Sequence, residues 1–162
     1  MKDQKVSFLT QAAMIAAAYV VLTILFAPIS FGQVQIRIAE ALTVLPFFTP
    51  AAVPGLFIGC LIANIVGGAI LPDIIFGSLA TLIGAFFTYR LRSYSKYLAI
   101  LPPILSNTII VPFVLYYAYG VNLPIPFMML TVGIGEVISC GVLGMIVYSA
   151  LQKYCYRIFR LA

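Results

Sequence analysis

Long runs of apolar residues dominate the sequence, and short polar or proline-containing segments separate them. The runs are continuous rather than alternating, which is typical of membrane-spanning helices and not of the strands of a membrane barrel. The second run is short and contains Pro46, which predicts a broken helix followed by a tight turn. A polar loop is expected at residues 30–35. The sequence predicts six spans, at about residues 8–27, 36–48, 51–66, 73–89, 97–117 and 126–148.

The composition also indicates a membrane protein. Apolar side chains make up 64% of the 162 residues, charged side chains make up 8%, and the mean hydropathy is +1.15. Soluble domains carry about 25% charged residues, so this chain has too few polar groups to face water. We therefore expect a single all-α transmembrane domain over residues 1–162, folded as a bundle of six helices.

The net charge of +5 indicates the topology of the chain rather than an affinity for nucleic acid. Basic residues gather near the start of the chain, between the fourth and fifth spans, and near the end. Basic loops stay on the cytoplasmic side of a membrane. The sequence therefore predicts that both termini are cytoplasmic.

The residues that metal sites and active sites require are missing or badly spaced. The chain has no His, and Cys60, Cys140 and Cys155 show no paired or metal-type spacing. We expect buried thiols, no metal and no cofactor. No nucleophile–base pair or phosphate-binding glycine loop is present, so an enzyme is improbable and any ATP-driven work needs a partner.

A few polar side chains lie inside the apolar runs, and an ionisable group in a membrane marks a functional site by default. Arg37, Glu40, Asp73 and Asn107 each have a structural interpretation beside the functional one. Arg37 and Glu40 are three residues apart, so they either neutralise each other or bind a ligand. Asp73 suits the start of a helix, and Asn107 can join two helices. The candidate ligand-binding residues are Arg37, Glu40, Asp73, Asn107 and Glu136.

Glu136 has no such structural explanation. It lies in the middle of the sixth span, and Gly133 and Gly135 leave room beside its carboxylate. Three carboxylates against one arginine favour a ligand that donates hydrogen bonds or carries positive charge. A purine-like base with an N–H group next to an amino group fits, because a carboxylate accepts two parallel N–H bonds well.

Small residues four apart in the first span allow another helix to approach closely. The two pairs are Ala12 with Ala16 and Ala13 with Ala17. Their spacing alone does not distinguish a partner protein from the chain's own helices.

The runs QIRIAEALT and TPAAVPGLFIGCLIAN, followed by DIIFGSLATLIGA, resemble the QueT family. The resemblance covers essentially the whole chain. It implies a substrate-binding S component of an energy-coupling factor (ECF) transporter in a bacterial plasma membrane. It also implies a 7-deazaguanine ligand related to queuosine, one transmembrane coupling protein and two cytoplasmic ATPases. In such proteins alanines four apart in the first helix contact the coupling protein, which here means Ala12 with Ala16 or Ala13 with Ala17.

Two other transport functions remain open. One is an S component for another vitamin-like solute. The other is a stand-alone proton-coupled carrier in which Glu136 carries the proton.

Overall fold

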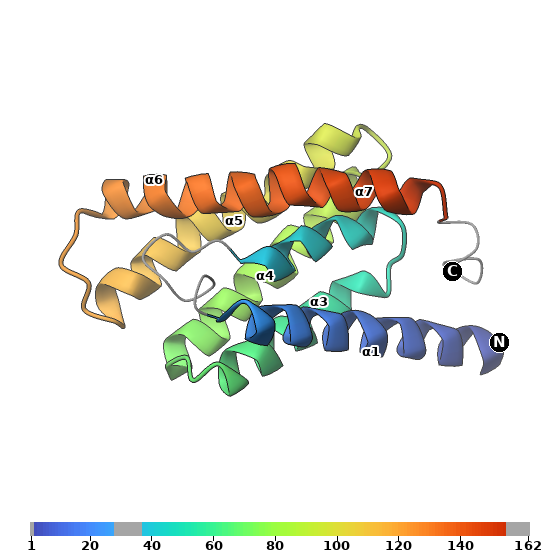
Figure 1. Ribbon diagram of the computed structural model, residues 1–162, viewed down its shortest axis with the longest axis horizontal. Helices are drawn as coiled ribbons and strands as arrows, with labels where there is room; N and C mark the ends of the chain where they lie inside the picture. The colour runs from blue at the N-terminus through green and yellow to red at the C-terminus, as the bar shows by residue number, and fades with distance from the viewer. Residues whose placement is uncertain (1, 28–36, 155–162) are drawn as a thin grey trace.

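The computed structural model describes residues 2–27 and 37–154, and the loop expected at residues 30–35 lies outside this part. All regular elements in the described residues are helical (Figure 1). In chain order they are α1 (Lys2–Leu25), η1 (Ile38–Phe47), α3 (Ala52–Val66), α4 (Leu71–Leu91), α5 (Lys96–Tyr117), α6 (Ile125–Glu136), η2 (Val137–Leu143) and α7 (Gly144–Gln152). The all-helical prediction is thereby confirmed.

Four of the expected spans are helices that are long and apolar enough to cross a membrane. They are Gln4–Leu25, Leu71–Leu91, Lys96–Tyr117 and Ile125–Gln152. The last combines α6, η2 and α7 into one rod (Figure 1). Helix α1 begins at Lys2 rather than near residue 8, so the polar residues before Phe8 form its first turns.

The two remaining spans form shorter helices. The 3-10 helix η1 has ten residues, which is about 20 Å at 2.0 Å per residue, and Pro46 lies near its end as expected. Helix α3 has 15 residues, which is about 22 Å. Both are shorter than the hydrocarbon core of about 30 Å. Six complete crossings therefore remain a prediction.

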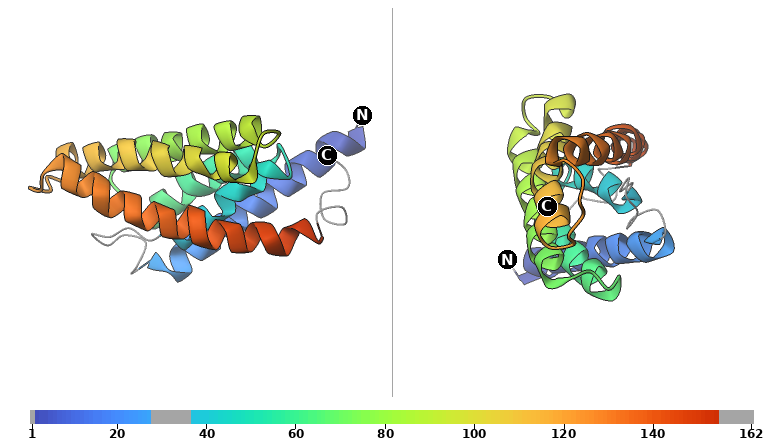
Figure 2. Two further views of the ribbon diagram at one scale, coloured as in Figure 1. Left: turned by 90° about the horizontal axis from the view of Figure 1, so that it is seen from above. Right: turned by 90° about the vertical axis from the view of Figure 1, so that its left-hand side faces the viewer.

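The short helix η1 occupies the centre of the bundle. It contacts α1, α3, α4, α5, η2 and α7. Seen end-on, it lies between α1 and α7 (Figure 2, right). Its fully buried residues include Glu40, Thr43 and Pro46. The side chains of η1 are therefore enclosed by most of the other helices.

The basic clusters lie at one end of the bundle. The start of α1, the connection between α4 and α5, and the end of α7 share this end (Figures 1 and 2). Lys5, Arg90, Arg92, Lys96 and Lys153 belong to these segments. This arrangement is the one that the topology prediction requires, and the orientation of this end toward the cytoplasm stays a prediction.

Helix α1 has two different small-residue faces. Ala12 and Ala16 are buried, whereas Ala13 and Ala17 are exposed. A Cβ atom added to Gly55 of α3 would lie 2.7 Å from the carbonyl oxygen of Ala12. A Cβ atom added to Gly59, one turn further, would lie 3.0 Å from the Cα atom of Ala16. The Ala12 and Ala16 pair is thus used inside the chain, to bring α1 close to α3.

Glycine has a similar role between α4 and α5. A Cβ atom added to Gly84 would lie only 2.6 Å from the Cα atom of Pro103, so the two backbones meet there. Gly133 differs, because its added Cβ would meet the side chain of Thr108 at 3.4 Å, an ordinary contact. The two glycines offer a matched pair of substitutions.

We expect Gly84→Ala to lower the free energy of unfolding by about 1–3 kcal/mol, because the backbone of Pro103 must move to admit the methyl group. Gly133→Ala should be neutral or stabilising by up to about 1 kcal/mol, since alanine favours a helix. Thermal loss of the helical circular dichroism signal in detergent measures both. Equal midpoints for the two variants would contradict the close contact at Gly84.

Candidate functional site

Glu40 is the centre of a buried polar cluster. Its side chain is fully buried, and three elements hold it. The hydroxyl of Tyr19 on α1 donates a hydrogen bond to Oε1 of Glu40. The hydroxyl of Thr81 on α4 lies 3.4 Å from the same oxygen. The backbone carbonyl of Glu40 lies 3.5 Å from the thiol of Cys140 in η2.

Glu136 lies beside Glu40, at the point where α6 meets the π-helical stretch η2. It is 3% exposed. Its Oε1 accepts a hydrogen bond of 3.0 Å from the side-chain amide of Asn107 on α5. Its Oε2 lies 3.2 Å from the thiol of Cys140, one turn further along the rod. Short π-helical stretches occur frequently at functional sites, and this one begins directly after Glu136 and contains Cys140.

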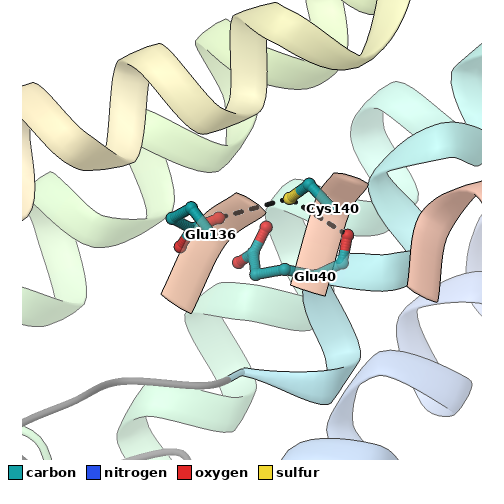
Figure 3. Close-up of side chains that lie close together, drawn as sticks. All are labelled: Glu40, Glu136 and Cys140. Atoms are coloured by element: carbon teal, nitrogen blue, oxygen red, sulfur yellow. Dashed lines mark hydrogen bonds between the residues drawn. The ribbon is translucent and has the colours of Figure 1, made fainter. Parts of the chain in front are cut away.

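The two carboxylates and the thiol form a compact group of possible metal ligands. One ligand atom from each of Glu40, Glu136 and Cys140 lies within 4.8 Å of the others. Figure 3 shows the two carboxylates next to each other, with the thiol beside them. Carboxylates and thiolates do bind zinc. Each of these side chains already takes part in hydrogen bonds here, and we assign no metal to them.

A second polar group adjoins the first, at the ends of η1 and α4. Arg37 Nη2 lies 4.0 Å from Asp73 Oδ2, and both residues are buried. The hydroxyl of Tyr119, in the loop after α5, donates to the same oxygen of Asp73 at 2.9 Å. Partial burial, together with the nearby charge of Asp73, raises the pKa of Tyr119 and so keeps its hydroxyl a donor. Asp73 therefore links η1 to the loop after α5.

Gly77 leaves the space that this second group needs. A Cβ atom added there would lie 3.2 Å from Asp73 Oδ1 and 3.3 Å from the side-chain nitrogen of Asn64. Asn64 is itself buried on α3. The glycine thus allows polar side chains from α3 and α4 to approach each other.

The structure brings together all five residues that the sequence analysis selected. Asn107 contacts Glu136, and Arg37 pairs with Asp73. The carboxylate of Glu40 lies close to that of Glu136, and the charge of Arg37 acts on it as well. Each of the five is at most 5% exposed. All five are therefore buried inside the bundle, and their contact with a ligand stays a prediction.

Three further members of the cluster were missed from the sequence. They are Tyr19, Thr81 and Cys140. A tyrosine in the middle of an apolar helix is a usable signal, because a buried hydroxyl needs a hydrogen-bond partner. Thr81 and Cys140 give no such signal, since both residue types are common in membrane helices without a functional role. Cys60 is buried as expected, and Cys155 lies outside the described residues.

Comparisons with known proteins identify the family of the chain. No solved structure matches the chain. A region of 85 residues is 35% identical to the "Queuosine precursor transporter QueT" of Lactococcus lactis subsp. cremoris (strain MG1363). This region covers 51% of the present chain and 50% of that protein, so the match spans about half of its length.

A family model gives the broader match. The model described as "QueT transporter" matches residues 9–153, which run from within α1 to the end of α7 and include the whole polar cluster. Both names describe transporters rather than enzymes. The chain belongs to the QueT transporter family.

Proposed function

We propose that this protein binds a queuosine precursor, a 7-deazaguanine compound, and carries it into the cell. The observation that carries the proposal is membership of the QueT transporter family, together with the name of the Lactococcus lactis relative. The polar cluster supports it independently. Its described charged groups are three carboxylates and one guanidinium, which favours a ligand rich in N–H donors.

The proposed site consists of Arg37, Glu40, Asp73, Asn107 and Glu136. The carboxylates of Glu40 and Glu136 would accept N–H groups of the ligand, and the Asn107 amide would donate to a ligand carbonyl. A base with a carbonyl, a ring N–H and an amino group on one edge offers this combination. Binding would replace contacts within the cluster by contacts with the ligand, so the buried groups would keep their hydrogen bonds.

We further propose that the chain is the S component of an ECF importer in a bacterial plasma membrane. Its partners would be one transmembrane coupling protein and two cytoplasmic ATPases, which would supply the energy of ATP hydrolysis. Ala13 and Ala17 are the proposed partner contact on α1. They are exposed, whereas Ala12 and Ala16 are already packed against α3.

Calorimetric titration of the detergent-purified chain tests the ligand. Queuine and its deazaguanine precursors should bind without any partner, while riboflavin should not bind, because its ring system presents a different edge. Comparison with guanine tests whether binding requires the 7-deaza ring system. Binding of riboflavin alone would contradict the ligand class and favour a vitamin carrier of another specificity.

Glu136→Gln tests the role of the carboxylate. Removing a charged acceptor should weaken deazaguanine binding by about 1.5–3 kcal/mol, which is about a 10- to 150-fold loss of affinity. Thr88→Val is a suitable control, because Thr88 is also fully buried and hydrogen-bonded but lies two helical turns beyond Thr81 on α4. Equal affinity in wild type and Glu136→Gln would remove Glu136 from the site.

The two alanine faces test the partner contact. Ala13→Leu with Ala17→Leu should leave ligand binding and folding intact but prevent co-purification with the coupling protein. Ala12→Leu with Ala16→Leu should instead destabilise the isolated chain, because leucine does not fit against Gly55 and Gly59. Normal assembly of the Ala13 and Ala17 double variant would contradict the proposed contact.

Uptake experiments separate this proposal from a proton-coupled carrier. ECF-type uptake should require the ATPases and survive an uncoupler of the proton gradient. Uptake by the chain alone that collapses with an uncoupler would favour the carrier, with Glu136 carrying the proton.

A further inference from the structure

The Tyr19 side chain is fixed from several sides. It is 1% exposed, and its hydroxyl points from α1 to Glu40 on η1. A Cβ atom added to Gly59 of α3 would lie 2.9 Å from the Tyr19 Cβ, so α3 contacts the base of this side chain directly. The hydroxyl of Thr23 also donates to the Tyr19 carbonyl at 2.9 Å. The ring therefore has little freedom to leave the cluster.

The two oxygens of the Glu40 carboxylate differ in what they accept. Oε1 accepts the hydroxyl of Tyr19 and lies within reach of the hydroxyl of Thr81. Oε2 is buried and has no hydrogen-bond donor among residues 4–27 and 37–154. The side-chain amide of Asn107 also has a hydrogen-bonding interaction with the Glu40 carboxylate, but its hydrogen bond of 3.0 Å goes to Oε1 of Glu136.

A buried carboxylate oxygen without a donor is costly, and a ligand N–H group would remove that cost. A carboxylate with both oxygens open accepts two parallel N–H groups from one ligand edge. Because Oε1 already accepts the Tyr19 hydroxyl, Glu40 has one oxygen left for this purpose.

We propose that Tyr19 is a specificity-determining residue, which occupies Oε1 of Glu40 and leaves Oε2 as the acceptor for a single ligand donor. The inference rests on the proposed function, because it concerns the ligand of the same site. Glu40 then accepts one N–H group of the ligand. The second N–H group on the same ligand edge needs another acceptor, such as the neighbouring Glu136.

Tyr19→Phe removes the hydroxyl and keeps the ring. The test compares the affinities of the purified chain for a 7-deazaguanine and for the matched 7-deazahypoxanthine, which lacks the amino group. In Tyr19→Phe, Oε1 becomes available, and the ligand with two donors gains a hydrogen bond that the other ligand cannot make. The preference for the 7-deazaguanine should therefore rise about tenfold over the wild-type preference.

Thr23→Val is the matched control, because it removes a buried hydroxyl from the same helix without touching Glu40. It should leave the preference unchanged. If Tyr19→Phe does not fold, Thr81→Val provides the second variant. The hydroxyl of Thr81 lies 3.4 Å from Oε1 and 3.2 Å from the carbonyl of Gly77. Its hold on Oε1 is therefore weaker than that of Tyr19, and a shift in the same direction but of smaller size is expected, about twofold to threefold.

The outcomes separate this inference from the proposed function. Wild-type protein that binds both bases, with a preference that Tyr19→Phe leaves unchanged, would overturn the inference and keep the proposed function. Equal loss of both affinities in Tyr19→Phe would also overturn the inference alone, since it indicates a packing role only. Wild-type protein that binds neither base would overturn the proposed function and the inference together.

Discussion

The structure depends on the burial of a charged helix in a medium that cannot solvate it. Helix η1 carries Glu40 in the centre of the bundle, where its side chain is fully buried and its carboxylate depends on protein groups for hydrogen bonds. Tyr19 from α1, Thr81 from α4 and Cys140 from η2 therefore lie around it. The packing of helices that are far apart in the sequence follows from this requirement.

Close helix contact makes the arrangement possible. The hydroxyl of Tyr19 reaches Glu40 because α1 lies almost directly on Gly55 and Gly59 of α3. Gly84 brings α4 equally close to α5, the helix that supplies Asn107. Small residues at the crossings and polar residues at the centre thus belong to one arrangement, as is usual where apolar side chains gain nothing by leaving lipid.

The helices and the positions of the charges could be predicted from the sequence. Continuous apolar runs and Pro46 located the ends of most elements within a few residues, because these signals are local. Glu40 and Glu136 could also be identified locally, because a charged residue within an apolar run is costly in a membrane and therefore marks a candidate site. Tyr19 could not be found with equal ease, since its importance lies in a contact across 21 positions of the chain. The choice between the two alanine pairs likewise required the packing of α1 on α3.

The structure constrains the two faces of α1 to different degrees. Its inner face carries Ala16 and Tyr19, and a change there disturbs both the contact with α3 and the polar cluster. Its outer face carries Ala13 and Ala17, which touch none of the groups around Glu40. A substitution on the outer face can therefore change what this helix meets in the membrane without disturbing the polar cluster inside the bundle.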